Sequence, residues 1–161
     1  MQSTILLPGK IHYYNKPEEK YGAHICYFLP VDVVFDHLAQ IPADEGPDPP
    51  GLAALQRMLK TGRCWVKLSA PYRVSQKGSS YGNVCRLVAK LLAANSDRLV
   101  WGSDWPHTSP HGHDPEPNGA ITPFRQLDTG HVLNLLAAWI PDERVRRKIL
   151  VDNPARLYMF T

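Results

Sequence analysis

Apolar residues along this chain fall into short runs rich in β-branched residues and longer runs with helical spacing. Three short runs, each ended by polar residues or proline, predict buried strands over residues 31–36, 64–69 and 98–104. In other segments apolar residues recur every three or four positions, as on one face of a helix. We therefore expect helices over residues 51–60, 82–94, 129–140 and 142–151. This alternation of strands and helices favours an α/β fold with parallel strands.

Two segments lack such a pattern. Residues 1–30 show no clear period, and a strand over residues 3–7 is left open there. Residues 105–123 contain five prolines and three histidines and predict a loop. Loops of this length without secondary structure are usually functional or disordered.

Composition narrows the class of protein. The chain has 161 residues, of which 43% are hydrophobic and 20% charged, as in one soluble domain or part of one. The net charge is only +3, and the basic residues at 144–148 alternate with apolar ones, so we expect no nucleic-acid partner. Three separated cysteines without CxxC spacing favour a cytoplasmic protein. No apolar run approaches the roughly 20 residues of a membrane span, and the N-terminus has too short an apolar core for a secretory signal.

The clearest chemical signal lies at residues 97–107, with the sequence DRLVWGSDWPH. An apolar strand pattern runs into a Gly-Ser pair and then presents Asp104, after which Pro106 ends regular structure. Barrel enzymes keep their catalytic groups at the carboxyl ends of parallel strands, where this pattern places Asp104. The structural alternative is that Asp104 caps a turn, as aspartates often do.

Four segments together resemble the amidohydrolase-related family of TIM-barrel hydrolases, especially its 2-pyrone-4,6-dicarboxylate lactonase-like branch. They are VVFDHL at 33–38, WVKLSAPYR at 65–73, LVWGSDWPH at 99–107 and ILVDNPARLY at 149–158. Each segment alone is a weak signal, but the four in this order and spacing are specific. The resemblance covers roughly residues 30–160.

The resemblance implies a partial (β/α)8 TIM barrel, in which the predicted strands are barrel strands six to eight with their helices. A complete barrel takes about 250 residues, and the family's first strand carries a His-x-His pair that residues 1–30 lack. We therefore expect a poorly matched N-terminal segment over residues 1–30 and the C-terminal part of an amidohydrolase-type barrel over residues 31–161. His111 and His113 have the required spacing, but they lie in the proline-rich loop and are interpreted as a coincidence.

The resemblance also implies a hydrolase that adds water to a lactone, or to a related cyclic ester or amide, of a carboxylated small molecule. An aspartate is ionised at neutral pH, so Asp104 is expected to take a proton from water as the general base. His37 is expected to polarise the carbonyl and to stabilise the oxyanion. Arg73 is expected to bind a substrate carboxylate through its planar guanidinium. Tyr72 and His107 are the further candidates for substrate contacts.

Strand geometry adds an expectation about faces, because successive side chains point to opposite sides of a sheet. If Asp104 points into the barrel lumen, the same alternation places Val33, Phe35 and His37 on the lumen side. Lys67 is expected there too, as a lysine paired within the lumen, since an unpaired buried charge is costly.

No metal or other cofactor is predicted, because His37 and Asp104 are two candidate ligands and a catalytic zinc usually takes three. Zinc or another divalent metal enters only with an alternative function, a metal-dependent decarboxylase of the same superfamily. The remaining alternative is a truncated remnant without catalytic activity. The expected partner is a small-molecule substrate, and an exposed sheet edge favours a homo-oligomer.

Overall fold

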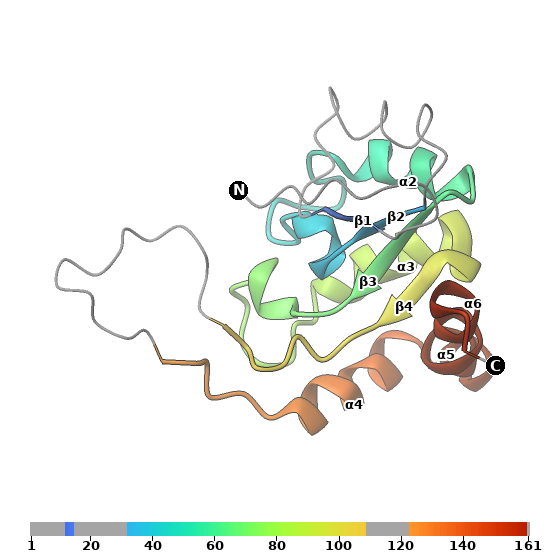
Figure 1. The fold of residues 1–161 in the computed structure, drawn as a ribbon. Helices are drawn as coiled ribbons and strands as arrows, with labels where there is room; N and C mark the ends of the chain where they lie inside the picture. The colour runs from blue at the N-terminus through green and yellow to red at the C-terminus, as the bar shows by residue number, and fades with distance from the viewer. Residues whose placement is uncertain (1–11, 15–31, 109–122, 161) are drawn as a thin grey trace, which may run out of the picture.

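The computed structural model describes residues 12–14, as backbone, together with residues 32–108 and 123–160. Its strands are β1 (His12–Tyr14), β2 (Val33–Phe35), β3 (Cys64–Leu68) and β4 (Leu99–Trp101). They form one parallel sheet in the order β1-β2-β3-β4 (Figure 1). Its longer helices are α2 (Leu52–Lys60), α3 (Val84–Asn95) and α4 (Thr129–Trp139), followed by α5 (Glu143–Arg147) and α6 (Asn153–Tyr158). The predicted α/β fold with a parallel sheet is confirmed.

The three predicted strands are present, but each is shorter than expected. β4 was expected to reach residue 104, yet it ends at Trp101, and Asp104 has a positive φ of 59° that an extended strand does not allow. The expectation of three strands is corrected to four, because β1 pairs with β2. β1 has the sequence His-Tyr-Tyr and lies in no apolar run of the kind that contains β2, β3 and β4, so the sequence pattern did not indicate it. The strand left open over residues 3–7 lies outside the described residues.

One face of the sheet packs on the helices. Val33 and Phe35 of β2 lie in the main core with Val66 of β3 and Leu99 of β4. The helices contribute apolar stripes to the same core, with Leu55 and Leu59 from α2, Val88 and Leu91 from α3, and Leu136 from α4. Full burial of one such side chain stabilises the fold by about 1.5–3 kcal/mol. This core fixes the strands from behind and leaves their other face for different contacts.

The opposite face of the sheet carries a smaller cluster. Val34, Trp65 and Val100 pack there against Leu157 of α6. Figure 1 shows α5 and α6 near the amino ends of the strands, away from the strand ends that carry the polar residues. This face is therefore apolar toward the amino end and open to polar side chains toward the carboxyl end.

Val33 and Phe35 face the helices, so their predicted position on the lumen side is wrong. The prediction assumed that the alternation of side chains along the strand continues as far as His37. However, the turn η1 (His37–Gln40) begins with a left-handed residue, with φ 52° at His37, and the alternation ends there. Lys67 does lie on the expected face, because it is the register partner of Val100.

The helix predicted over residues 142–151 is divided in the structure. α5 is followed by η4 (Lys148–Asp152), which is a π-helical turn, and then by α6. α6 has proline in its first turn, where the missing N–H removes one helical hydrogen bond. A wider turn is one way in which a helix accommodates such a loss. Within residues 32–108 and 123–160, no helix is long and apolar enough to cross a membrane.

Candidate active site

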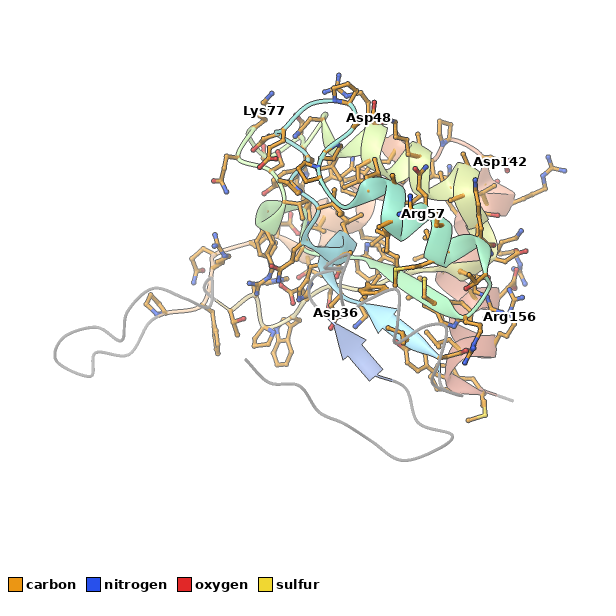
Figure 2. All side chains as sticks on the ribbon, turned by 90° about the horizontal axis from the view of Figure 1, so that it is seen from above. Asp36, Asp48, Arg57, Lys77, Asp142 and Arg156 are labelled. Carbon is orange, nitrogen blue, oxygen red and sulfur yellow. The ribbon has the colours of Figure 1, made fainter. Side chains whose placement is uncertain are left out.

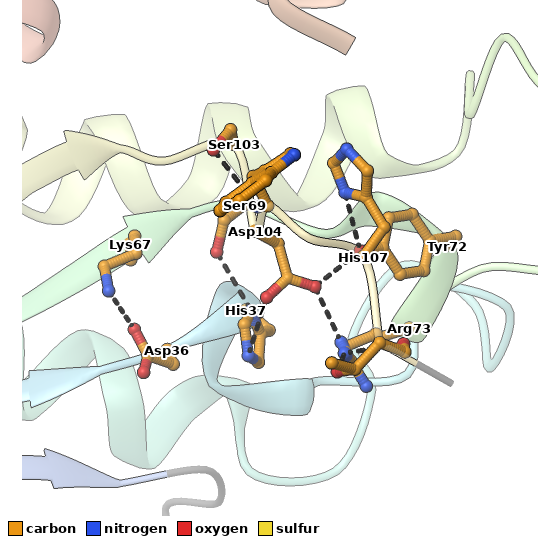
Figure 3. Close-up of polar contacts among 11 residues, drawn as sticks. Asp36, His37, Lys67, Ser69, Tyr72, Arg73, Ser103, Asp104 and His107 are labelled. Atoms are coloured by element: carbon orange, nitrogen blue, oxygen red, sulfur yellow. Dashed lines mark hydrogen bonds and ion pairs between the residues drawn. The ribbon is translucent and has the colours of Figure 1, made fainter. Parts of the chain in front are cut away.

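The carboxyl ends of β2, β3 and β4 each leave the sheet through a residue with a left-handed backbone. These residues are His37 with φ 52°, Ala70 with φ 49° and Asp104 with φ 59°. This conformation costs a non-glycine residue about 1–2 kcal/mol. Such residues are often found at functional sites, where surrounding contacts hold them in place. Here the three turns bring polar side chains from three strands together (Figure 3).

Asp104 lies at the centre of this cluster, with 15% of its side chain exposed. Its Oδ2 accepts a hydrogen bond from the Tyr72 hydroxyl at 2.5 Å and another from Arg73 Nε at 3.1 Å. Its Oδ1 lies 3.6 Å from His37 Nε2, which is beyond a normal hydrogen bond. One carboxylate oxygen is therefore fixed by two donors, and the other faces an imidazole (Figure 3).

His37 is held through its other ring nitrogen. Its Nδ1 lies 3.0 Å from Ser69 Oγ, and Ser69 is buried. Burial is the main cause of a lowered pKa at His37. The charged groups nearby are two carboxylates that oppose this shift and two cations that add to it, namely Asp104, Asp36, Arg73 and Lys67. With its pKa below the ordinary 6.5, His37 is a neutral imidazole at neutral pH.

Both donors to Asp104 come from the short turn η2 (Pro71–Arg73), which directly follows β3 and Ala70. Arg73 also uses its Nη2 to donate to the carbonyl oxygen and to Oγ1 of Thr108, each at 3.1 Å. The guanidinium thus connects Asp104 to the loop beyond it. Burial, followed by the hydrogen bond to Asp104, raises the pKa of Tyr72, so its hydroxyl keeps its proton and remains a donor.

His107 lies behind Tyr72 and is only 4% exposed. Its Nδ1 is 3.4 Å from the Tyr72 hydroxyl, and its Nε2 is 2.9 Å from Thr129 Oγ1 at the start of α4. Arg125 also packs against Tyr72, with its guanidinium carbon 5.0 Å from the centre of the Tyr72 ring. The wall behind Asp104 is therefore built from buried polar and aromatic groups in contact with one another.

A second ion pair lies on the same face of the sheet, nearer its middle. Lys67 Nζ is 2.5 Å from Asp36 Oδ1, so the mid-strand lysine has the partner that its position requires (Figure 3). Gly102 on the neighbouring chain segment makes room for this lysine, because a Cβ at Gly102 would lie 2.9 Å from Lys67 Cδ. Packing against Lys67 thus explains why position 102 is a glycine.

The structure brings the five residues predicted from the sequence into one cluster. Asp104 and His37 face each other, Tyr72 and Arg73 bind Asp104, and His107 stands behind Tyr72. Here Arg73, Tyr72 and His107 contact protein groups, and their binding of substrate stays a prediction. Sequence reasoning missed three polar partners, namely Ser69, Thr108 and Thr129. The one available signal was the alternation that puts Ser69 on the same face as Lys67.

The number and charge of these residues determine whether they can hold a metal ion. Among the residues that the structure describes, no group of three or more His, Cys, Asp or Glu side chains is placed to hold one. His37 and Asp104 are neighbours, but Asp104 already carries the Arg73 guanidinium, which competes with a second cation. A catalytic zinc with three protein ligands does not fit these residues by themselves. His111 and His113 lie outside the described residues.

The arrangement defines a class of protein: an α/β domain with its polar site residues at the carboxyl edge of a parallel sheet, where such enzymes hold their catalytic groups. Residues 28–160 match the sequence profile of the amidohydrolase family, and the chain belongs to this family. The resemblance seen in the four sequence segments is thereby confirmed.

Individual relatives support the same assignment. The chain is 34% identical over 130 residues to a 4-sulfomuconolactone hydrolase from Hydrogenophaga intermedia, covering 81% of this chain and 40% of that protein. It is 31% identical over 125 residues to a D-galactarolactone isomerase from Agrobacterium fabrum, covering 78% and 39%. The crystal structure of a putative 2-pyrone-4,6-dicarboxylic acid hydrolase from Pseudomonas putida matches with a TM-score of 0.62 and 28% identity, over 80% of this chain and 43% of that one. The chain thus spans about 40% of the length of the curated relatives it matches.

Proposed function

We propose that this chain forms the C-terminal part of a barrel hydrolase that adds water to a lactone or a related cyclic ester or amide. In this proposal β2, β3 and β4 are strands six to eight of a (β/α)8 barrel. Two of the relatives described above are named for lactones, one as a hydrolase and one as an isomerase, so the lactone is their shared element. One relative is named for a lactone with a sulfo group, and the matching crystal structure is named for a dicarboxylic acid. Both names favour an anionic substrate here.

The observation that supports the proposal most directly is that the two oxygens of Asp104 have different contacts. Tyr72 and Arg73 hold Oδ2, so the carboxylate cannot rotate freely, and Oδ1 faces His37 Nε2 across 3.6 Å. A carboxylate fixed in this way is pre-oriented to accept a proton from a water molecule. A capping aspartate, the alternative considered from the sequence, would instead accept backbone N–H groups in its own turn.

The proposed reaction begins when Asp104 Oδ1 takes a proton from water and the resulting hydroxide forms a bond to the lactone carbonyl carbon. His37, as a neutral imidazole, donates a hydrogen bond to the carbonyl oxygen as negative charge develops on it. Collapse of the tetrahedral intermediate breaks the ring C–O bond. The proton held by Asp104 then passes to the leaving ring oxygen, which restores the carboxylate.

Arg73 is proposed to bind the substrate's anionic group. Its Nη2 contacts with Thr108 are hydrogen bonds to a loop residue, and an anionic substrate can replace them with charge-assisted bonds of about twice the strength. Nε can remain on Asp104 during this exchange. Substrate binding would in this way be coupled to the position of the general base.

The test compares Asp104→Asn with Asp48→Asn in hydrolysis of a panel of carboxylated lactones. Asp104→Asn keeps the shape of the side chain and removes the base, so the rate should fall about 10²–10⁴-fold. Asp48 is an exposed aspartate paired with Lys90, and its replacement should leave the rate unchanged. Equal rates for the wild type and Asp104→Asn, or no hydrolysis of any lactone by the wild type, would contradict the proposal.

A further inference from the structure

The contact between Ser69 and His37 determines which nitrogen of His37 carries its proton. His37 is neutral at neutral pH, so only one ring nitrogen bears hydrogen. Its Nδ1 faces Ser69 Oγ at 3.0 Å, and its Nε2 faces Asp104 Oδ1 at 3.6 Å. A serine hydroxyl can either donate or accept, whereas an ionised carboxylate can only accept. The two possible tautomers therefore differ in energy because of Asp104.

With the proton on Nδ1, the lone pair of Nε2 would point at a carboxylate oxygen, and two negative charge densities would face each other. With the proton on Nε2, the N–H dipole points toward that oxygen, which is favourable at this distance and burial. The second arrangement leaves Nδ1 as an acceptor in need of a donor. Ser69 is 1% exposed and lies within hydrogen-bond distance of that atom.

We propose that Ser69 is a positioning residue that donates its hydroxyl proton to His37 Nδ1 and so keeps the imidazole proton on Nε2. The consequence for catalysis rests on the proposed function: Nε2–H is the group that would meet the lactone carbonyl oxygen. Ser69 acts through His37 and touches no substrate itself. This role differs from the usual arrangement, in which a histidine Nδ1–H donates to a carboxylate or a carbonyl.

The surroundings of Ser69 fix its position. It follows β3 by one residue, its backbone N–H donates to the carbonyl of Lys67 at 3.0 Å, and Ala70 after it has a left-handed backbone. Gly102 packs against it, since a Cβ at Gly102 would lie 3.7 Å from Ser69 Cβ. These contacts leave the hydroxyl directed to the imidazole, as Figure 3 shows.

Nitrogen-15 NMR of the whole chain tests the tautomer directly, with the His37 resonances assigned by their loss in His37→Gln. In the wild type above pH 7 we expect a pyrrole-type Nε2 that carries hydrogen and a pyridine-type Nδ1 that accepts a hydrogen bond. Ser69→Ala should move the Nδ1 resonance to higher frequency, because the acceptor loses its donor, and Ser69→Thr should restore it. A wild-type spectrum with hydrogen on Nδ1 would overturn the inference even if Ser69→Ala did not fold.

Ser75→Ala is the matched control, because Ser75 is also buried but bonds to Asn83 instead of a histidine. It should leave the His37 resonances in place, and an equal shift in both variants would overturn the inference. In the lactone assay, Ser69→Ala should lower kcat about tenfold, the effect of one hydrogen bond, with little change in KM, and Ser69→Thr should recover most of it. If the wild type hydrolyses no lactone, the proposed function fails, and the NMR result still decides the role of Ser69.

Discussion

The two ends of the sheet both bury polar side chains, but these side chains have different partners. At the amino end, Asn153 is fully buried and donates its Nδ2 to the carbonyls of Ser96 and Leu99, at 2.9 and 2.6 Å. At the carboxyl end, Asp104 is bound by side chains from a neighbouring strand's turn and faces His37. In Figure 2 the label of Arg156, on α6, marks the amino end of the sheet, and the label of Asp36, after β2, marks the carboxyl end.

The contacts at the amino end stabilise the fold, whereas those at the carboxyl end hold the candidate catalytic groups. Asn153 satisfies backbone groups that would otherwise be buried without a partner, so its hydrogen bonds attach the C-terminal helices to the start of β4. Trp65 extends this role, since its indole donates to Asp32 at 3.2 Å and the Arg98 guanidinium lies 4.6 Å over its ring. At the other end, left-handed residues and paired charges are held at a cost in energy, which is typical of a functional site.

Replacement of Asn153 should have the largest effect on stability. Asn153→Ala removes this donor from the buried Leu99 carbonyl and the partly buried Ser96 carbonyl and opens a small cavity, so the free energy of unfolding should fall by about 2–4 kcal/mol. The free energy of unfolding is measured by urea denaturation, with circular dichroism as the signal. Asn134→Ala, at an exposed position of α4, is the control and should change stability by less than about 0.5 kcal/mol. An effect of Asn153→Ala no larger than that of the control would remove the distinction between the two ends.

The sequence predicted the elements well, because each consists of a run long enough to show its period. The helices over residues 51–60, 82–94 and 129–140 are present within one or two residues of their predicted bounds. The helix over 142–151 was predicted as one piece, since apolar spacing does not show a π-helical turn. β1 was missed because its sequence, His-Tyr-Tyr, is not part of a longer apolar run, whereas the equally short β2 and β4 lie within the runs at 31–36 and 98–104.

The candidate site was predictable for residues that stand at strand ends, and less so for their contacts. Asp104 and His37 were found from local sequence and from the family resemblance, and they do face each other. The argument for His37 was wrong in part, because a left-handed turn and not strand alternation directs it there. Ser69 could not be assigned to His37, because they are 32 residues apart and only the register of β2 and β3 brings them together.

Removal of the Tyr72 hydroxyl should have a smaller effect, and mainly on the carboxyl end. Tyr72→Phe takes away the 2.5 Å hydrogen bond to Asp104 Oδ2 and leaves Arg73 as the other donor to that oxygen. Stability should fall by about 1 kcal/mol, and lactone hydrolysis should fall several-fold because the base is less firmly oriented. Tyr81→Phe, at another buried tyrosine, is the control for loss of a hydroxyl. If both variants hydrolyse lactones equally fast, the Tyr72 hydroxyl has no part in orienting Asp104.

The pH dependence of stability isolates the contribution of His37. Because folding lowers the pKa of His37, the unfolded chain binds this proton more tightly than the folded chain. The stabilising contribution is therefore complete above about pH 6.5, the ordinary pKa, and is lost as the pH falls from there through the lower folded pKa. The slope from this one group cannot exceed about 1.4 kcal/mol per pH unit. Denaturant unfolding between pH 4.5 and 7.5, a range of about three units around that ordinary pKa, measures the dependence in the wild type and in His37→Gln.

The difference between these two curves should grow as the pH rises toward 6.5 and then level off, since His37→Gln removes the only group that changes between them. Asn134→Ala provides the comparison, because Asn134 is exposed and carries no titratable group. Its curve should stay parallel to that of the wild type across the window in which His37 titrates. If His37→Gln also stays parallel there, the imidazole is not held neutral by burial. The tautomer preference assigned to Ser69 would then apply only above about pH 6.5, the ordinary pKa, because a charged ring carries hydrogen on both nitrogens.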